Sequence, residues 1–413
     1  MAGQSQQVQI KTLIKRGIKI SKTTYTTKKA QEKAFLVGVD TGKRDGWTEE
    51  ESLDELAQLT RTAGSQVAGR MIQKLNQPHG LTYLGKGKLD ELILKRQNSD
   101  WDLIIFDDEL TPRQQNTLEE LLKVKIIDRV ALILDIFARH ARTHEGKLQV
   151  EMAQHQYLLP RLAGQWSHLE RLGGGIGTRG PGESQLETDK RLIRNKLSKL
   201  KKELEEVRKH RTLYRGNRRR SGIPIVAIVG YTNTGKSTLL NALSQANVLA
   251  ENKLFATLDP TTKRLTLPDM KTVLLTDTVG FIRKLPTDLV DAFRATLEEI
   301  SEATVLLHIV DLTSHNAAEQ SQVVEGILKD LGLEDKPRIT VLNKIDLLLD
   351  KNEQWDEVRA LGFLNHLAGN NPNTVLISAG KKWGLKKMLE ILNRVVDEQT
   401  ASCLLQSSQN EPL

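Results

Sequence analysis

The feature that most constrains the fold is an eight-residue motif near the middle of the chain. Residues 230–237 are Gly-Tyr-Thr-Asn-Thr-Gly-Lys-Ser, between the apolar run Ile223–Val229 and the helix-forming stretch Thr238–Ala246. This is the pattern G-x-x-x-x-G-K-S between a strand and a helix. In such a loop the backbone N–H groups surround a β-phosphate, while Lys236 reaches the β- and γ-phosphates and the Ser237 hydroxyl binds Mg²⁺. The motif predicts a nucleotide-binding α/β domain.

Three further motifs follow in an order that selects the nucleotide. A predicted strand, Val273–Asp277, leads into the D-x-x-G pattern of residues 277–280, where Asp277 can hold Mg²⁺ through water and the Gly280 N–H can contact the γ-phosphate. The N-K-x-D pattern at residues 343–346 ends in a carboxylate that accepts both N1–H and N2–H of guanine, which adenine lacks. Residues 378–380, Ser-Ala-Gly, can present a backbone N–H to guanine O6. Together the four motifs predict a GTP-binding domain and Mg²⁺-dependent GTP hydrolysis.

A switch threonine is expected between the first two motifs, because a hydroxyl must close over Mg²⁺ and the γ-phosphate. The segment Phe255–Thr262 offers Thr257, Thr261 and Thr262, and their chemistry alone does not rank them.

The residue after D-x-x-G is Phe281, where many Ras-like enzymes place a glutamine that orients the attacking water. We therefore expect slow intrinsic hydrolysis that a partner stimulates by arranging the switch loops. Two interpretations of Asn233 remain open: it holds a K⁺ ion that substitutes for an arginine finger, or it hydrogen-bonds within the loop.

The charge of the chain is concentrated in one segment. The 413 residues carry a formal net charge of +8, and residues 190–220 hold 14 Lys and Arg against 3 Glu. A segment this basic suits a nucleic-acid phosphate backbone, although a solvated helix face is the alternative. A single cysteine, Cys403, excludes a disulfide scaffold, and no apolar run is long enough to span a membrane. We expect a soluble, monomeric, cytoplasmic protein.

The pattern of apolar residues divides the chain into six segments. We expect a flexible basic arm at 1–33, a small α/β domain at 34–145, a coiled helical hairpin at 146–214, a basic linker at 215–222, a GTPase domain at 223–398 and a polar tail at 399–413. In the second segment strands alternate with amphipathic helices, which indicates a mostly parallel sheet. The expected elements are strands at 35–40, 66–74, 101–107 and 124–128, and helices at 48–63, 88–97 and 111–122.

The hairpin is predicted from two heptad stripes. The first contains Leu148, Met152, His155, Leu159, Leu162, Trp166 and Leu169, and the second contains Leu186, Ile193, Leu197, Leu200, Leu204 and Val207. Pro160 should kink the first helix. Six glycines in residues 173–182 separate the two stripes, either as an idle flexible tip or as a tip that approaches an irregular RNA surface closely. The expected RNA-binding residues are Arg171, Arg179, Lys196, Lys199, Lys201, Lys202, Arg208 and Lys209.

Two smaller clusters have simpler explanations. Gly85–Lys88 precedes a helix and could bind an anion, such as a second nucleotide, but helix capping with surface lysines explains it more simply. His140, His144 and Glu145 lack a third well-placed metal ligand, so we interpret them as structural.

These motifs together resemble the HflX family of translational GTPases. The segments that carry the resemblance are residues 142–146 (Arg-Thr-His-Glu-Gly), the glycine-rich stretch 173–182 with 183–189 after it, the phosphate-binding loop, and 255–262. The resemblance implies an N-terminal α/β domain with a helical hairpin, a Ras-like GTPase domain, and binding of GTP or GDP and of the large ribosomal subunit with its rRNA. It also implies that Thr257 is the switch-I ligand of Mg²⁺, and that a C-terminal extension seen in some members is missing or reduced.

The site predictions are then as follows. For nucleotide binding we expect Gly230, Tyr231, Thr232, Asn233, Thr234, Gly235, Lys236, Ser237, Phe255, Ala256, Thr257, Leu258, Asp259, Asp277, Thr278, Val279, Gly280, Asn343, Lys344, Ile345, Asp346, Ser378, Ala379 and Gly380. The catalytic set is Lys236, Thr257, Gly280 and Asn233, and the Mg²⁺ ligands are Ser237, Thr257 and, through water, Asp277. The predicted role is GTP-dependent ribosome splitting, rescue or recycling, with a GTP-gated ribosome-assembly or RNA-remodelling factor as the alternative.

Overall fold

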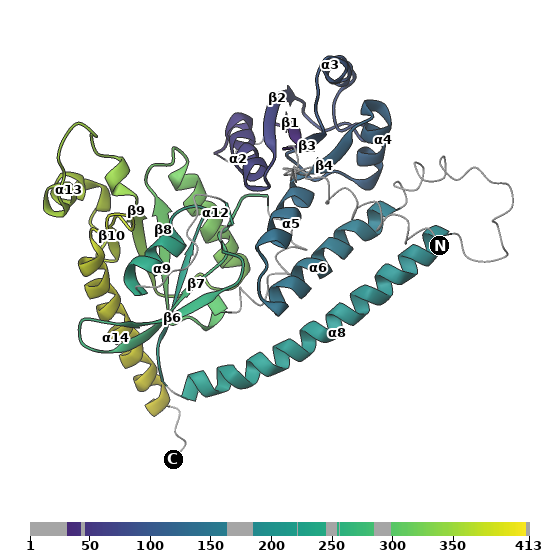
Figure 1. The fold of residues 1–413 in the computed structure, drawn as a ribbon. Helices are drawn as coiled ribbons and strands as arrows, with labels where there is room; N and C mark the ends of the chain where they lie inside the picture. The colour runs from purple at the N-terminus through teal and green to yellow at the C-terminus, as the bar shows by residue number, and fades with distance from the viewer. Residues whose placement is uncertain are drawn as a thin grey trace, which may run out of the picture. The chain divides into compact units, whose positions relative to one another are not determined.

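A computed structural model provides the fold, and it describes residues 31–42, 46–162, 185–220, 222–244, 254–255, 257–284 and 299–409. Most of the expected N-terminal arm, the glycine-rich stretch at 173–182 and the last four residues therefore lie outside the described residues. Two sheets, the first parallel and the second mostly parallel, organise the described chain from Glu32 onward, each with its own helices (Figure 1).

The first sheet has four parallel strands in the order β2-β1-β3-β4, as the strand–helix alternation predicts. The strands are β1 (Lys33–Asp40), β2 (Gln66–Lys74), β3 (Leu103–Phe106) and β4 (Lys125–Asp128). The helices between them are α2 (Glu49–Thr62), α3 (Lys86–Gln97) and α4 (Pro112–Leu122). Thr48 and Thr111 cap α2 and α4 with complete capping boxes, which explains why both helices begin there.

Alternate residues of β1 and β3 enter two different hydrophobic clusters, because neighbouring side chains of a strand point to opposite faces. Leu36 and Ile105 pack with α2 and with α5 (Arg129–His140) on one face. Phe35 and Phe106 pack with α3 and α4 on the other face. Sequence reasoning did not identify α5, whose residues follow β4 directly after the N-cap Asp128.

The predicted helical hairpin is present as α6 (His144–Leu158) and α8 (Gln185–Arg220). Leu148 of α6 packs against Leu200 and Leu204 of α8, with Met152 and Val207 beside them. Two ion pairs give the direction: Glu145 meets Arg211 and Glu151 meets Lys196, so residue numbers rise on one helix as they fall on the other. The hairpin is therefore antiparallel, and α6 and α8 lie side by side in Figure 1.

Both ends of the hairpin differ in detail from the expectation. The α-helix of the first stripe ends at Leu158 and a 3₁₀ turn, η1 (Leu159–Arg161), contains Pro160, as expected from the ring's clash with a preceding carbonyl. Helix α8 continues to Arg220, so residues 215–220 of the expected linker are its last turns. His155 is half-buried beside Glu151, and burial, with Lys196 nearby, lowers its pKa.

The second sheet has six strands in the order β10-β9-β8-β5-β7-β6, and only β6 is antiparallel to its neighbour. The strands are β5 (Ile225–Gly230), β6 (Thr261–Thr266), β7 (Thr272–Asp277), β8 (Val305–Asp311), β9 (Arg338–Asn343) and β10 (Thr374–Leu376). Helices α9 (Lys236–Ser244) and α14 (Leu385–Gln409) cover one face, and α12 (Ala317–Asp330) packs on the other. Helix α13 (Glu357–Leu364) and the short turns η2 (Ile345–Leu347) and η3 (Asn365–Ala368) form a separate small cluster.

Among the described helices, none combines the length and apolar composition that a membrane crossing requires.

Candidate functional site: the nucleotide loops and their contacts with the N-terminal domain

The four predicted motifs lie at the carboxyl ends of parallel strands, where α/β sheets usually bind ligands. The phosphate-binding loop follows β5, D-x-x-G follows β7, N-K-x-D follows β9 and the Ser-Ala-Gly loop follows β10. Asn343 joins three of these segments, because its Nδ2 donates to the Thr234 carbonyl (2.8 Å) and its Oδ1 accepts from the Ala379 N–H (3.0 Å). Gly235 has φ of 98°, and a Cβ there would lie 2.4 Å from the Asn343 amide nitrogen, so only glycine fits.

Lys236 is buried along the inside of the loop. Its Nζ donates to the carbonyls of Gly230 (3.1 Å) and Tyr231 (2.6 Å). These two hydrogen bonds hold the ammonium group inside the loop that would surround the phosphates. Burial lowers the pKa of Lys236 to about 8, against the opposing influence of Asp277. A bound polyphosphate would raise this pKa again, because an opposite charge favours the ammonium form.

Three oxygen-bearing side chains converge beside Lys236. The Ser237 hydroxyl lies 2.6 Å from Asp277 Oδ2 and 2.7 Å from Thr257 Oγ1, and Thr257 donates to the same carboxylate oxygen at 2.9 Å. The other carboxylate oxygen, Asp277 Oδ1, is buried without a hydrogen-bond partner in the described structure, and burial raises the pKa of this group. A cluster of hard oxygen ligands with an unsatisfied buried carboxylate oxygen fits a Mg²⁺ ion.

The structure separates the three candidate switch threonines. Thr257 belongs to the cluster around Asp277, whereas Thr261 and Thr262 lie in β6, where they pair with Asp277 and Thr276 of β7. Thr262 Oγ1 hydrogen-bonds Thr276 Oγ1 at 2.9 Å, so its hydroxyl is used within the sheet.

The loop after D-x-x-G is connected to the phosphate-binding loop through the backbone. The Thr232 N–H donates to the Phe281 carbonyl (2.8 Å) and the Phe281 N–H donates to the Gly230 carbonyl (3.1 Å). The Phe281 side chain is buried in a hydrophobic cluster and offers no polar group to a water molecule. A Cβ on Gly280 would lie 2.8 Å from Thr232 Cα and 2.9 Å from Lys236 Nζ, so this glycine allows the two loops to approach closely.

On the guanine side, Lys344 has φ of 65° and its Nζ pairs with Asp311 at 2.7 Å. Asp346 is half-buried at the turn η2, and Ser378 Oγ accepts from the Lys381 N–H at 3.0 Å. Asn233, with φ of 60°, is half-buried in the phosphate-binding loop.

Several predicted site residues also contact the N-terminal domain, which sequence reasoning missed. Tyr231 Oη, which accepts from the Arg283 N–H of its own domain at 2.9 Å, donates to Glu55 of α2. Phe255 packs edge-on against Phe137 of α5 with ring centroids 4.6 Å apart. Asp259 accepts hydrogen bonds from the backbone N–H groups of Arg142 and Thr143. Nothing in the spacing of the motifs signals these contacts, because they join positions more than 100 residues apart.

The outcome for the RNA-binding candidates is mixed. Arg171 and Arg179 lie outside the described residues. Lys196 pairs with Glu151 of α6 (2.6 Å), Lys199 with Glu203 (3.7 Å) and Lys209 with Glu206 (2.9 Å), all on or beside α8. Lys201 and Lys202 are exposed and Arg208 is half-buried. Among the described residues no group of three or more His, Cys, Asp or Glu side chains is placed to hold a metal, and the structural interpretation of His140, His144 and Glu145 stays a prediction.

A phosphate-binding loop, D-x-x-G and N-K-x-D on one six-stranded sheet define a P-loop GTPase. Three family models match the chain: "GTP-binding GTPase N-terminal" at residues 50–138, "GTP-binding GTPase Middle Region" at 140–218 and "50S ribosome-binding GTPase" at 225–344.

Curated relatives identify the family. The GTPase HflX of Caldanaerobacter subterraneus is 51% identical over 90% of this chain and 82% of the relative, and that of Escherichia coli is 42% identical over 87% and 83%. The chain belongs to the HflX family and is a GTPase, which confirms the resemblance in the sequence. A solved GTP-binding protein from Sulfolobus solfataricus in complex with GDP is 26% identical, covers 89% of this chain and 99% of its own, and has a TM-score of 0.43.

Proposed function

We propose that this GTPase binds the large ribosomal subunit in its GTP-bound state and couples hydrolysis to ribosome splitting, rescue or recycling in the cytoplasm. The observation that carries the proposal is the basic helix α8, whose residues 190–220 hold 14 Lys and Arg against 3 Glu. Lys199, Lys201, Lys202 and Lys209 are all exposed on it. Exposed cations on one helix suit the phosphate backbone of rRNA.

In the proposed mechanism, the nucleotide loops bind Mg²⁺·GTP with the residues predicted from the motifs. Ser237 and Thr257, whose hydroxyls lie beside Asp277, would hold the metal, Asp277 would act on it through water, and Lys236 would neutralise charge on the β- and γ-phosphates. The Gly280 N–H contacts the γ-phosphate. Mg²⁺ would neutralise the charge that develops on the phosphate oxygens during transfer. Because Phe281 cannot orient water, hydrolysis is slow until a ribosomal partner arranges the switch loops.

Neutralising the outer face of α8 tests the RNA contact. In the variant Lys199→Gln, Lys201→Gln, Lys202→Gln, Lys209→Gln, the binding of large subunits should weaken and its salt dependence should become shallower by about 0.7–0.9 per lost phosphate contact. Lys196 is left unchanged because its ion pair with Glu151 connects α8 to α6. The matched control replaces four exposed lysines of the first domain, Lys74, Lys86, Lys123 and Lys125, with glutamine. Equal salt dependence in both variants would contradict an RNA-binding role for α8.

Sucrose gradients separate splitting from the alternative role in assembly. Dissociation of intact ribosomes by this protein with a nonhydrolysable GTP analogue supports splitting, whereas association only with immature large subunits supports a GTP-gated assembly factor.

The role of Asn233 has its own test. If Asn233 holds a K⁺ ion beside the phosphates, turnover should be faster in K⁺ than in Na⁺ buffer, and Asn233→Ala should remove the difference. Equal rates in the two buffers for the unmodified protein would contradict K⁺ activation and leave Asn233 as a residue that hydrogen-bonds within its loop.

A further inference from the structure

The segment that contains Thr257, here called switch I (residues 254–255 and 257–259), is anchored on the first domain at several points. Leu254, Phe255 and Leu258 are each less than 5% exposed and belong to the hydrophobic cluster that also contains residues of α2 and α5. Thr257 lies between these anchors, with its hydroxyl beside Ser237 and Asp277. The position of the hydroxyl at the metal cluster therefore depends on how the segment is anchored.

The polar anchor is Asp259, and its side chain is directed at the first turn of α6 rather than at the phosphate-binding loop. Its Oδ2 accepts hydrogen bonds from the Arg142 N–H at 2.8 Å and the Thr143 N–H at 2.9 Å, and its Oδ1 accepts one from the Thr143 hydroxyl. Thr143 is itself the N-cap of α6. The carboxylate thus accepts from the N-cap residue of α6 and from the residue before it, and the positive end of the helix dipole stabilises its negative charge.

Gly146 shows that this contact is a close fit. A Cβ added at residue 146 would lie 2.3 Å from Asp259 Oδ1 and 3.1 Å from Thr143 Oγ1. Gly146 is in the first turn of α6, where alanine would otherwise favour the helix. A side chain at residue 146 would have to displace the Asp259 carboxylate, whereas glycine leaves room for that carboxylate.

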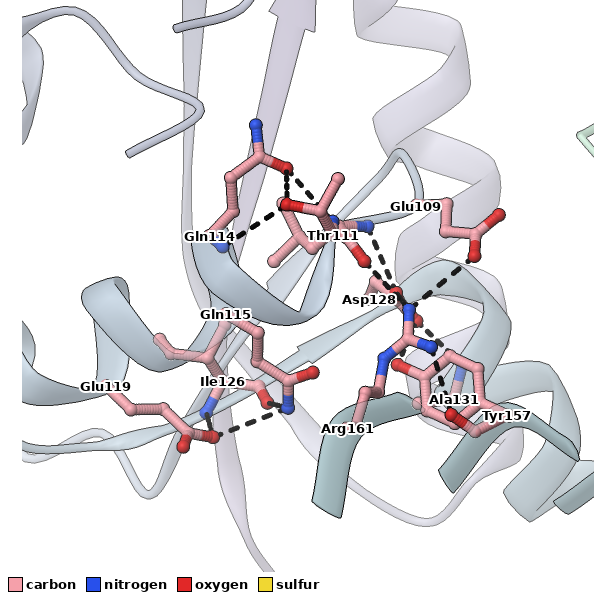
Figure 2. A network of polar contacts seen from close by, with 11 residues as sticks. Glu109, Thr111, Gln114, Gln115, Glu119, Ile126, Asp128, Ala131, Tyr157 and Arg161 are labelled. Carbon is pink, nitrogen blue, oxygen red and sulfur yellow. Dashed lines mark hydrogen bonds and ion pairs between the residues drawn. The ribbon is translucent and has the colours of Figure 1, made fainter. Parts of the chain in front are cut away.

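Helix α6 is held at both ends, so it can transmit a displacement of switch I. At its start Glu145 pairs with Arg211 of α8 (3.1 Å). Just after its end, Arg161 stacks over Tyr157 and reaches Asp128 at the end of β4, as Figure 2 shows. Tyr157 donates to the other oxygen of Asp128 at 2.9 Å.

We infer that Asp259 is a positioning residue: it fixes switch I to the start of α6, so that the closed Mg²⁺·GTP site and the α6–α8 hairpin stabilise one another. The inference rests on the proposed function only in taking RNA as the ligand of the hairpin. Coupling of this kind is reciprocal. If GTP strengthens the binding of a ligand to the hairpin by some factor, that ligand strengthens GTP binding by the same factor.

The first test uses the isolated protein and two glycine variants. Gly146→Ala should displace Asp259 and weaken the binding of a nonhydrolysable GTP analogue about fivefold, the loss expected from one helix cap, with a matching rise in the Mg²⁺ needed for half-saturation. GDP affinity should not change, because GDP does not need Thr257 closed over the metal. The control is Gly326→Ala in α12, where a Cβ meets no atom within 4 Å, and it should leave both affinities unchanged.

Asp259→Asn is the second variant, and it should shift the same two quantities in the same direction because it removes the charge and one strong acceptor. Thermal unfolding of each variant separates a local effect from loss of the fold. An equal loss of GDP and GTP-analogue affinity, or an unchanged GTP-analogue affinity in Gly146→Ala, would overturn the inference.

The second test measures the coupling to RNA. Large-subunit binding should be stronger with the GTP analogue than with GDP, and Gly146→Ala should reduce that ratio while Gly326→Ala preserves it. If the unmodified protein does not bind the subunit, the proposed function fails, whereas the nucleotide measurements still decide the role of Asp259. If the ratio is the same in both variants, the coupling between switch I and the hairpin is refuted.

Discussion

Two buried arginines of the first domain, Arg129 and Arg161, have similar surroundings and different partners. Arg129, at the start of α5, is 1% exposed and pairs with Glu55 and with Asp107 (2.6 Å). Arg161, in η1, has a side chain that is 7% exposed and pairs with Asp128 (3.3 Å). Both meet a carboxylate at the carboxyl end of a parallel strand, where a polar side chain can leave the core of the sheet.

The difference lies in where each network continues. The partners of Arg161 that the structure shows all belong to residues 109–157 (Figure 2). The network of Arg129 extends to the GTPase domain: Glu55 accepts from Tyr231 of the phosphate-binding loop, and Asp107 pairs with Lys284, four residues after Gly280. The Arg161 network therefore fixes the end of α6 within the first domain. The Arg129 network connects the phosphate-binding loop and the loop after D-x-x-G to the first domain.

Removal of the shared cation should have the largest effect. Burial opposes the charge of Arg129, but Asp107 and Glu55 outweigh it and raise its pKa. Arg129→Met leaves two buried carboxylates without their common partner, so the free energy of unfolding should fall by about 3–5 kcal/mol in urea denaturation.

The matched control for that variant is Arg161→Met, for which we expect a smaller loss of about 1–3 kcal/mol. Asp128 retains donors in this variant, namely the Leu110 N–H (3.1 Å), the Ala131 N–H (2.9 Å) and the Tyr157 hydroxyl (2.9 Å). If Arg129→Met were the milder variant, Lys284 and Ser52 would suffice to compensate Asp107, and the network would not depend on its arginine.

A pair of tyrosines tests the contact between the domains at a finer scale. Tyr231→Phe removes one donor to Glu55 and the acceptor of the Arg283 N–H, so we expect a loss of about 1–2 kcal/mol in the free energy of unfolding. Tyr157→Phe removes a single donor to Asp128, which keeps others, and should cost less. The same denaturation experiment compares them, and equal losses would mean that the contact between the domains adds nothing beyond an ordinary hydrogen bond.

The contrast between contacts within one domain and contacts between the two domains also explains how much could be predicted from the sequence. The nucleotide loops were predictable because a phosphate-binding loop needs fixed residue types at fixed spacing next to a strand and a helix, as residues 230–237 show. The parallel sheet followed from periodicity, with bounds correct to within a few residues, for example α4 at Pro112–Leu122. The hairpin followed from its heptad stripes, but α6 ends at Leu158, and Trp166 and Leu169 of the first stripe lie outside the described residues. By contrast, the links from Tyr231 to Glu55 and from Asp259 to Thr143 join residues 176 and 116 positions apart, and no local pattern encodes such pairings.

Helix α5 was missed for a related reason. Its sequence, Arg-Val-Ala-Leu-Ile-Leu-Asp-Ile-Phe-Ala-Arg-His, is largely apolar and seven of its residues are buried, so its polar face is narrow and centred on the exposed pair Asp135 and Arg139. Its first residue is Arg129, a charged side chain that only tertiary partners make acceptable in the core.

The last prediction concerns a carboxylate beside the Arg129 network. Glu49 begins α2, its Oε1 is buried without a hydrogen-bond partner in the described structure, and a Cβ on Gly38 would meet that oxygen at 2.4 Å. Burial raises the pKa of Glu49 from 4.5 to about 7; Lys284 lowers it, and Asp107 raises it further.

Because the pKa of Glu49 is higher in the folded state, its protonated form contributes stability that is fully present below pH 4.5 and lost as the pH rises through about 7. Glu49→Gln should therefore unfold with the same free energy as the unmodified protein at low pH and be more stable by about 1 kcal/mol above pH 7, after allowance for solvent screening. Glu50→Gln, on the exposed side of the same turn, is the control and should follow the unmodified protein at each pH. The contradicting outcome is a Glu49→Gln variant whose free energy of unfolding depends on pH between 4.5 and 7 as that of the unmodified protein does. The group that titrates in this range would then be another member of the Arg129 network, and not Glu49.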